Sequence, residues 1–393
     1  MRALVVGAGI GGLAAALTLR RAGLEVAVRE QAPALREVGA GIQLAPNATR
    51  ILERLGLRPA LARVGVRPQT IEHRRWQDGR VLFRQPLGEA CEREFGAPYY
   101  HVYGPDLLDV LAAAVGPGAV GLGRRCVAVV ERADEVEVTF EDGASEHADV
   151  VIGADGLHST LRAALLGPES PWFSGSIAYR GLVPAERVAH LGLERIANSW
   201  LGPGRHFVHY WVAGGRSLNF VAVVPARDWR VESWSATGEV ADALAEFAGW
   251  HPTVPAIIGA AERTHRWGLY DREPLTTWSV GRVTLLGDAA HAMLPFMAQG
   301  ACQAIEDAAV LARCLADAAP ATVADGLRRY EKIRQPRVWQ VQRASRDNVV
   351  TYHLPDGDAQ RARDARYAAL MAASPWAARG WLFAYDADAA ATG

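Results

Sequence analysis

The sequence predicts an α/β fold that begins with a parallel sheet, continues through a β-rich layer and ends in a helical region. Three observations predict this fold. A strand, a glycine-rich turn and a helix open the chain, alternating apolar residues occupy its middle, and the pattern after residue 301 is mostly helical. With 393 residues the chain exceeds the usual size of one domain, so we expect two packed domains or one domain with a lid.

The first elements form the opening of a βαβ unit. Residues 3–6 are predicted as a buried strand, residues 11–22 as a helix that Gly23 ends, and residues 25–30 as a second strand. Gly7, Gly9 and Gly12 lie in the turn between the first strand and the helix, with the spacing G-x-G-x-x-G. This context gives the glycine pattern more weight than it would have alone.

The glycine turn predicts a dinucleotide site. Gly7 would make the tight turn, Gly9 would let the backbone approach a pyrophosphate, and Gly12 would let the helix pack closely on the strand. Glu30 ends the second strand, where a carboxylate can accept hydrogen bonds from ribose hydroxyls. A glycine turn without a ligand is the alternative, and this motif alone does not separate FAD from NAD.

The middle of the chain has a period of two. Val136, Val138 and Phe140 alternate with polar residues, and Asp142-Gly143 supplies a hairpin turn before a buried strand at 150–152. Further strands are predicted at 206–212, 218–224 and 283–286, and the helical region after 301 has breaks near Pro320, Pro355 and Pro375. The elements expected to bind a nucleotide therefore lie at 1–50, 150–165 and 281–305, and one domain is assembled from separated segments.

The composition excludes several classes of protein. The chain has 42 basic and 43 acidic residues and a formal charge of -1, which lacks the basic footprint of a nucleic-acid-binding protein. The four cysteines are far apart, so neither a metal site nor a disulfide scaffold is expected, and a reducing cytoplasm fits best. We also expect no membrane span, because no run reaches the roughly 20 apolar residues required.

Two later motifs accompany the glycine turn. Residues 153–162 read Gly-Ala-Asp-Gly-Leu-His-Ser-Thr-Leu-Arg, and residues 287–291 read Gly-Asp-Ala-Ala-His, each directly after a predicted strand. With Pro295, Gln299-Gly300 and residues 304–308, they resemble the signatures of the flavin-dependent aromatic hydroxylases. The resemblance implies a Rossmann-like domain that binds FAD without a covalent bond, with Asp155 near the pyrophosphate and Asp288 on the ribityl chain.

The same resemblance implies how the flavin ring is held. In the family, the segment containing Pro295, Gly300 and Ala301 passes the isoalloxazine ring, and the helix that starts there points its N-terminus at flavin N1 and O2. A helix N-terminus supplies partial positive charge, which suits a reduced flavin that is anionic at N1.

A narrower resemblance covers nearly the whole chain. Residues 39–48, 267–274 and 352–357 are similar to the branch that contains salicylate, 3-hydroxybenzoate and 6-hydroxynicotinate hydroxylases. This implies an NADH- or NADPH-dependent monooxygenase that uses O2, through a flavin C4a-hydroperoxide, to hydroxylate a phenolic or hydroxybenzoate-like substrate. An FAD-dependent dehydrogenase or oxidase is the alternative within enzymes, and a non-catalytic flavin-binding protein is the alternative outside them.

One position departs from the family pattern. Gly104 stands where the family usually has an arginine that contacts FAD. Arg36, Gln43 and Arg162 are candidates to replace that contact, and the choice among them stays open.

His206 and Tyr210 are the candidate catalytic residues. Because alternate residues of a strand share a face, they lie on one side of the strand at 206–212. The pair resembles the His and Tyr that line the substrate pocket of the 3-hydroxybenzoate and 6-hydroxynicotinate enzymes, and a histidine with a near-neutral pKa could remove a phenol proton. The alternative for His206 is a structural hydrogen bond. His291, Arg180 and Cys302 are interpreted as structural, with a substrate carboxylate as the alternative partner of Arg180.

The domain boundaries follow from these assignments. We predict an FAD-binding domain from residues 1–70, 100–170 and 278–320, a β-rich substrate domain from 71–99 and 171–277, and a C-terminal helical region from 321–393. The sequence leaves open whether the protein is a monomer or a homodimer.

Overall fold

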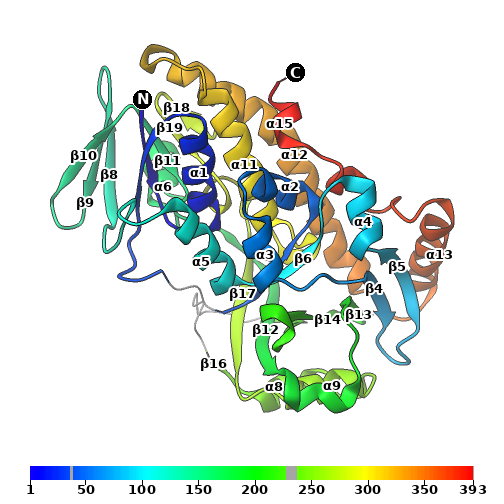
Figure 1. The fold of residues 1–393 in the computed structure, drawn as a ribbon. Helices are drawn as coiled ribbons and strands as arrows, with labels where there is room; N and C mark the ends of the chain where they lie inside the picture. Colours follow the sequence, from blue (N-terminus) through cyan, green and yellow to red (C-terminus); the bar gives the residue numbers. More distant parts are fainter. Residues whose placement is uncertain (36–38, 227–236, 393) are drawn as a thin grey trace.

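The chain folds around two large sheets in the computed structural model, which describes residues 1–35, 39–226 and 237–392 (Figure 1). One sheet has six strands and contains the N-terminal strand, and the other has eight strands from the middle of the chain. A three-stranded sheet and a two-stranded sheet complete the β structure of the described residues. The α/β fold class predicted from the sequence is confirmed.

The six-stranded sheet has two short apolar strands, β11 and β1, at its centre. Its strands pair in the order β18-β19-β11-β1-β2-β7, and neighbours are parallel except for β18 and β19. A parallel sheet of this kind is stable only when both of its faces are covered, which explains the continuous apolar runs in its central strands. The strands are β1 (Arg2–Val6), β2 (Glu25–Arg29), β7 (Val120–Gly121), β11 (Val150–Gly153), β18 (Ser279–Val280) and β19 (Val283–Leu285).

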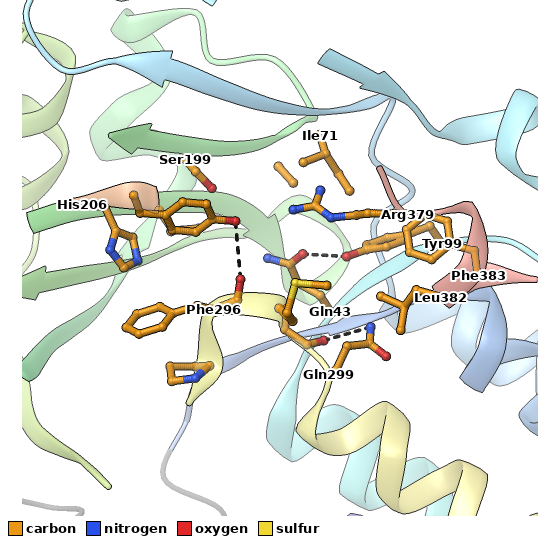
Figure 2. Close-up of a pocket in the computed structure, with 16 residues that line it drawn as sticks. Gln43, Ile71, Tyr99, Ser199, His206, Phe296, Gln299, Arg379, Leu382 and Phe383 are labelled. Atoms are coloured by element: carbon orange, nitrogen blue, oxygen red, sulfur yellow. Dashed lines mark hydrogen bonds between the residues drawn. The ribbon is translucent and has the colours of Figure 1, made fainter. Parts of the chain in front are cut away.

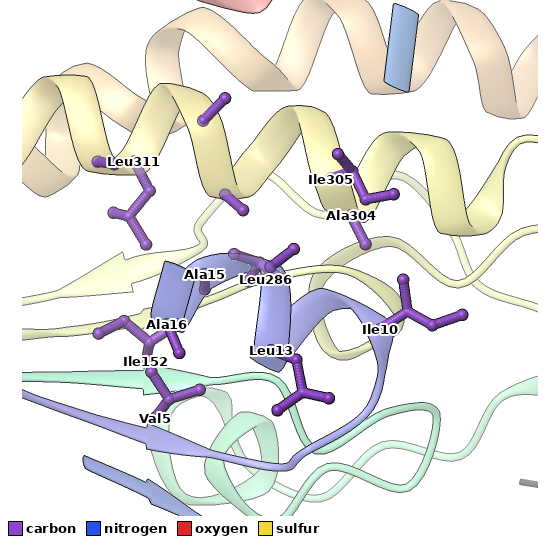
Figure 3. Close-up of a cluster of buried hydrophobic side chains, with 14 of the residues drawn as sticks. Val5, Ile10, Leu13, Ala15, Ala16, Ile152, Leu286, Ala304, Ile305 and Leu311 are labelled. Carbon is purple, nitrogen blue, oxygen red and sulfur yellow. The ribbon is translucent and has the colours of Figure 1, made fainter. Parts of the chain in front are cut away.

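Helix α1 (Ile10–Arg21) packs between this sheet and helix α11 (Gly300–Leu315) (Figure 3). A Cβ atom on Gly11 would lie 2.8 Å from Leu286 Cδ2 and 3.1 Å from Ala304 Cβ, so the two helices approach closely at a residue without a side chain. The Thr18 hydroxyl donates to the carbonyl oxygen of Ala308 at 2.8 Å. Helices α1 and α11 are therefore neighbours, although 290 residues separate Thr18 from Ala308 in the sequence.

The eight-stranded sheet runs in the order β16-β17-β12-β15-β14-β13-β4-β5 and is antiparallel except for the pair β13 and β4. One face, with Phe207 and Phe220, packs against helices α8 (Val240–Glu246) and α9 (Thr253–Gly259). The other face, with Leu201 and Val223, packs toward the C-terminal part of the chain. The strands are β4 (Thr70–Arg75), β5 (Val81–Pro86), β12 (Trp172–Pro184), β13 (Ala197–Gly202), β14 (Arg205–Val212), β15 (Ser217–Pro225), β16 (Thr237–Gly238) and β17 (Thr264–Asp271).

The two small sheets are antiparallel. The period-two segment forms a three-stranded sheet in the order β10-β9-β8, and the predicted Asp142-Gly143 turn lies between β9 and β10, with Gly143 at φ 81°. The strands are β8 (Cys126–Glu131), β9 (Val136–Phe140) and β10 (Ser145–Ala148), and the second pair is β3 (Gly41–Leu44) with β6 (Tyr100–Tyr103).

The C-terminal region is helical, as predicted. Pro355 and Pro375 lie between helices, and Pro320 begins a short 3-10 helix between α11 and α12, where the missing N–H of proline costs no helical hydrogen bond. Pro336, in contrast, lies inside α12. Helix α13 lies beside β4 and β5, so the end of the chain covers one end of the eight-stranded sheet (Figure 1). The helices are α12 (Val323–Tyr352), α13 (Asp358–Ala373), α14 (Gly380–Phe383) and α15 (Ala387–Ala390).

The remaining helices lie mainly around the six-stranded sheet, and within the described residues none of the helices is long and apolar enough to cross a membrane. They are α2 (Pro46–Arg54), α3 (Arg58–Val64), α4 (Gly88–Phe95), α5 (Gly104–Val115), α6 (Thr160–Leu166), α7 (Ala185–Val188) and α10 (Asp288–His291).

Candidate active site

The β1–α1 turn has the geometry that a phosphate cradle requires. Gly7 has φ 104°, and a Cβ atom there would lie 2.3 Å from the carbonyl oxygen of Ala154. A Cβ atom on Gly12 would lie 1.9 Å from the Gly7 carbonyl oxygen, whereas one on Gly9 would meet nothing within 4 Å. Gly7 and Gly12 are therefore required by packing, and Gly9 leaves open space in front of the backbone.

Glu30 lies beside this turn. Its carboxylate accepts hydrogen bonds from the backbone N–H groups of Ala8 and Ala32, each at 2.8 Å. Glu30 thus connects the end of β2 to the glycine turn, at the edge of the cradle where the resemblance expects a ribose.

Asp155 follows the central strand β11. The Ser159 hydroxyl donates to its carboxylate at 2.5 Å, and the backbone N–H of Leu161 donates at 3.1 Å, so Asp155 helps to hold the start of α6. Burial raises the pKa of Asp155, and these hydrogen bonds oppose the shift. Asp155 also lies next to Ala154, against which Gly7 packs.

Arg162 connects the second motif to the third. Its buried guanidinium donates to the carbonyl oxygens of Ala289 and Ala290, both at 3.3 Å, and to the carboxylate of Glu169 at 2.6 Å. Arg162 therefore has several protein partners and holds the third motif in position beside the second.

The third motif meets the start of α11. Asp288 is exposed and has no hydrogen-bond partner among the described residues. A Cβ atom on Gly300 would lie 3.9 Å from Asp288 Oδ1, so this carboxylate and the N-terminus of α11, which Gly300 and Ala301 form, face the same space. The backbone N–H of Gly287 donates to Asp307 at 3.0 Å and so ties the Gly-Asp turn to the same helix.

A buried charge network lies behind this turn. Arg334 is fully buried, and its guanidinium donates to Glu306 at 2.6 Å and to Asp307 at 2.7 Å. Arg337 also reaches Glu306, at 3.1 Å, and the buried ring of His291 bonds Asp307 at 2.5 Å. Burial alone would raise the pKa values of both carboxyls, but the neighbouring charges hold them below their ordinary values. The hydrogen bond to Asp307 gives His291 a structural role in this network.

A cavity of about 70 Å³ lies beside the 295–299 loop, which continues directly into α11 (Figure 2). Its walls come from strands β3, β4, β13 and β14, from Tyr99 just before β6, from this loop and from the C-terminal helices. They are largely apolar and aromatic, which is typical of a site for a small organic ligand. The lining residues are Gln43, Ile71, Tyr99, Ala197, Ser199, His206, Val208, Pro295, Phe296, Met297, Ala298, Gln299, Tyr352, Arg379, Leu382 and Phe383.

His206 lines the cavity as a neutral imidazole. Its ring is buried, and its Nδ1 atom lies 2.7 Å from Nε2 of the half-buried His353, so one ring donates to the other. Burial first, and then the neighbouring His353 and His73, lower the pKa of His206 well below its ordinary value. The expected near-neutral pKa is therefore wrong, because no carboxylate accompanies the buried ring to stabilise its charged form.

Tyr210 lies on the same face of β14 but is not among the residues that line the cavity. Its ring is 4.5 Å from the ring of His101, and a Cβ atom on Gly41 would lie 2.6 Å from Tyr210 Cε2. Burial raises the pKa of Tyr210 to about 12. Tyr210 thus packs against β3 and β6, next to the cavity.

The three candidates to replace the arginine contact missing at Gly104 lie in different places. Gln43 lines the cavity and accepts a hydrogen bond from the Tyr99 hydroxyl at 2.6 Å, whereas Arg162 lies at the third motif. Arg36 lies outside the described residues. Gly104 itself starts α5, and its N–H donates to the Ala40 carbonyl oxygen at 2.8 Å.

Two residues interpreted as structural have structural contacts. The Arg180 guanidinium lies 3.9 Å from the centre of the Trp267 ring. The Cys302 thiol is buried and lies 3.5 Å from the Gln43 carbonyl oxygen. Across the described ranges, no group of three or more His, Cys, Asp or Glu residues is placed to hold a metal ion.

The sequence did not indicate several lining residues. Tyr99, Tyr352, Arg379, Leu382 and Phe383 come from segments where no chemical motif was recognised. The 352–357 segment was noted only for its resemblance to the family, and nothing in the sequence singled out Arg379.

Comparison with known proteins identifies the family. The model of the FAD binding domain family matches residues 1–345. The 3-amino-4-hydroxybenzoate 2-monooxygenase PtmB3 of Streptomyces platensis is 47% identical over 386 residues, which cover 98% of this chain and 96% of that protein. The 6-hydroxynicotinate 3-monooxygenase of Bordetella bronchiseptica is 42% identical over 350 residues, covering 88% and 91%.

Solved structures agree with this result. A salicylate hydroxylase in complex with its substrate superimposes with a TM-score of 0.85 at 28% identity, covering 100% of this chain and 97% of that one. Klebsiella pneumoniae HpxO in complex with FAD and uric acid has a TM-score of 0.83 at 31% identity, covering 93% and 92%. The chain therefore belongs to the FAD-binding family of flavoprotein monooxygenases.

Proposed function

We propose that this protein uses FAD, NADH or NADPH, and O2 to hydroxylate a small phenolic aromatic acid in the cavity that His206 lines. One observation carries the proposal. The 295–299 loop forms a wall of the cavity and runs directly into the N-terminus of α11, which lies beside Asp288. The aromatic-lined cavity and the third flavin motif therefore share one element.

The residues at the site fit FAD. The open backbone at Gly9 and the glycine packing around it suit a pyrophosphate, and the unpartnered carboxylate of Asp288 suits ribityl hydroxyls. When bound, FAD would supply electron transfer from the nicotinamide coenzyme and the activation of O2. We propose that the cofactor is held by Gly7, Gly9, Gly12, Glu30, Gln43, Asp155, Arg162, Asp288, Pro295, Gly300 and Ala301.

The protein's own groups would prepare the substrate. In the overall reaction, one oxygen atom of O2 enters a ring C–H bond and the other leaves as water, while NAD(P)H supplies two electrons. We propose that His206 accepts the phenol proton, which makes the substrate ring more nucleophilic, and that the hydrogen bond to His353 orients the imidazole. The apolar walls exclude water, and Tyr210 supports β3 behind the cavity.

The names of the relatives support an aromatic acid as substrate. The two enzymes described above are named for 3-amino-4-hydroxybenzoate and 6-hydroxynicotinate, and a Klebsiella oxytoca relative at 34% identity over 392 residues is a 3-hydroxybenzoate 6-hydroxylase. Each name combines a ring hydroxyl with a carboxylate.

The proposal is tested by screening aromatic acids and phenols for stimulation of coenzyme oxidation by the FAD-loaded enzyme. We expect slow oxidation without a ligand, faster oxidation with the right aromatic acid, and a product heavier by one oxygen atom. Product mass and hydrogen peroxide should be measured together, because wasted turnover forms peroxide instead of product.

Three results would contradict the proposal. Fast oxidation of NAD(P)H that needs no ligand and forms one peroxide per coenzyme would indicate an oxidase. Turnover without O2 would indicate a dehydrogenase. Tightly bound FAD with no turnover on any compound of the screen would favour a non-catalytic flavin-binding protein.

Replacing Glu30 by alanine should weaken FAD binding by about 1 to 3 kcal/mol, the scale of a charge-assisted hydrogen bond. The variant loses a ribose acceptor and also the carboxylate that holds Ala8 and Ala32. Equilibrium dialysis of FAD measures the effect, and Glu25→Ala, at an exposed residue of the adjoining strand β2, is the control. Equal FAD affinity in both variants would remove Glu30 from the cofactor site.

The domain boundaries predicted from the sequence are retained as part of this proposal. β4 and β5 belong to the eight-stranded sheet together with strands from residues 172–271, which supports assigning residues 71–99 to the substrate domain. We also propose a cytoplasmic location, and size-exclusion chromatography with light scattering would distinguish a monomer from a homodimer.

A further inference from the structure

The cavity is lined by one arginine, Arg379. Among the described residues that line it, Arg379 is the only one with a permanent charge, and the other polar lining groups are amides, hydroxyls and the neutral His206. Arg379 lies at the start of α14, and its carbonyl oxygen accepts hydrogen bonds from the N–H groups of Leu382 and Phe383 at 3.0 and 3.1 Å. A short, well-anchored segment therefore places the guanidinium at the cavity.

The Arg379 side chain has an unsatisfied donor. Its Nη1 atom is buried without a hydrogen-bond partner, and no carboxylate within the described ranges forms an ion pair with the guanidinium, whose neutral partner is the Tyr352 hydroxyl. Arginines that are more deeply buried than the half-buried Arg379 differ: Arg334 pairs with Glu306 and Asp307, and Arg363 pairs with Asp364 at 2.8 Å. A guanidinium that lines the cavity and that no carboxylate neutralises can therefore bind an anionic ligand there.

The electrostatic surroundings favour an anion. Burial raises the pKa values of the lining residues Tyr99 and Tyr352, and the positive charge of Arg379 opposes both shifts. Neither phenol becomes an anion near neutral pH, so neither can neutralise the guanidinium. An arginine offers parallel N–H donors that match the two oxygens of a carboxylate.

Arg379 and His206 lie on opposite sides of the cavity (Figure 2). A ring ligand between them can direct its hydroxyl to the imidazole and its acidic group to the guanidinium. The aromatic and apolar side chains of Phe296, Met297 and Leu382 also line the cavity and suit the ring itself.

We propose that Arg379 binds the carboxylate of the aromatic substrate and thereby selects aromatic acids over neutral phenols. This inference rests on the proposed function and deepens it, because it assigns a specificity-determining residue on the C-terminal segment. The predicted signature is a loss of affinity that depends on the charge of the ligand.

The test compares acids with their carboxamides in the FAD-loaded enzyme. The probes are 3-amino-4-hydroxybenzoate and 4-hydroxybenzoate, each with the matching amide, and binding is measured by the change in flavin absorbance without coenzyme. Arg379→Gln should weaken binding of the acids by about tenfold to hundredfold, the range for a hydrogen-bonded charge pair, and should leave the amides nearly unchanged. Arg379→Lys should have an intermediate effect. Arg361→Gln, at an exposed arginine of α13, is the control.

The alternatives give different results. An equal loss for acids and amides would show that Arg379 only shapes the cavity, and a loss of FAD without an acid-specific effect would assign the guanidinium to the flavin; both overturn the proposal. If Arg379→Gln does not fold, the wild-type enzyme still decides, because equal affinity for an acid and its amide contradicts the inference. Failure of the proposed function is distinguishable, since then no aromatic compound would stimulate coenzyme oxidation by the wild-type enzyme.

Discussion

Replacing Arg334 by leucine should destabilise the protein by about 3 to 5 kcal/mol at neutral pH, the cost of leaving a buried charge without its partner. Arg334 is fully buried and pairs with both Glu306 and Asp307. Because Asp307 also accepts the N–H of Gly287, the loss should loosen the Gly-Asp turn and reduce FAD retention. Urea unfolding and FAD release measure the two effects.

The pH dependence of this variant has a defined sign. In the wild type, the pKa values of Glu306 and Asp307 are held low, so their contribution to stability is present at neutral pH and is lost as the pH falls through those low values. Without Arg334, only Arg337 at Glu306 and His291 at Asp307 still oppose the effect of burial, so both pKa values should rise and the variant should lose less stability than wild type on acidification. The difference from wild type should therefore shrink on acidification.

The exposed Arg328 on the same helix provides the control for Arg334. Its side chain is 66% exposed, and Arg328→Leu should change stability by less than about 1 kcal/mol. Equal stability of Arg334→Leu and wild type at both pH values would show that the buried network contributes nothing to the folded state.

Replacing His206 by asparagine should slow hydroxylation by about a hundredfold to ten-thousandfold, the usual effect of removing a general base. FAD should remain bound, because His206 lies in the substrate cavity and not at the glycine turn. The loss should become smaller at high pH, where the phenol ionises without help. Product formation and peroxide release measured from pH 6 to pH 9 test this expectation.

The wild-type enzyme has its own pH signature. Because burial holds the pKa of His206 well below its ordinary value, the ring stays neutral, and protonation of His206 should cause no loss of coupling between pH 8 and pH 6.

The control for His206→Asn is His209→Asn, since His209 lies on the opposite face of β14. If His206→Asn hydroxylates like wild type across the range, His206 is only a wall residue.

Much of the fold could be predicted because local patterns agreed with the final packing. The first strand, helix and second strand appear at Arg2–Val6, Ile10–Arg21 and Glu25–Arg29, each within one residue of the predicted ends. The alternation at 206–212 also predicted that His206 and Phe207 face opposite sides of a sheet, as they do. The spacing of apolar residues indicates which face of a helix or strand is buried, and in these elements the buried face in the structure agrees with that spacing.

The cavity could not be predicted in the same way. Arg379 is an ordinary arginine in the sequence, and only the packing of the C-terminal segment against Tyr99 and the 295–299 loop places it on the cavity wall. The pKa of His206 was mispredicted for a related reason, since its value depends on the burial of the ring and on His353, 147 residues away. Both properties arise from contacts between distant segments.

The discontinuous six-stranded sheet constrains when the protein can acquire its cofactor during synthesis. The glycine turn emerges first from the ribosome, but Gly7 packs against Ala154, and Gly11 against Leu286 and Ala304. A nascent chain that ends before β19 lacks Leu286 and Ala304 and also the carboxylate of Asp288. Flavin loading should therefore be a late event, after most of the polypeptide has been translated, and the early N-terminal segment must wait with exposed apolar strands for its distant partners.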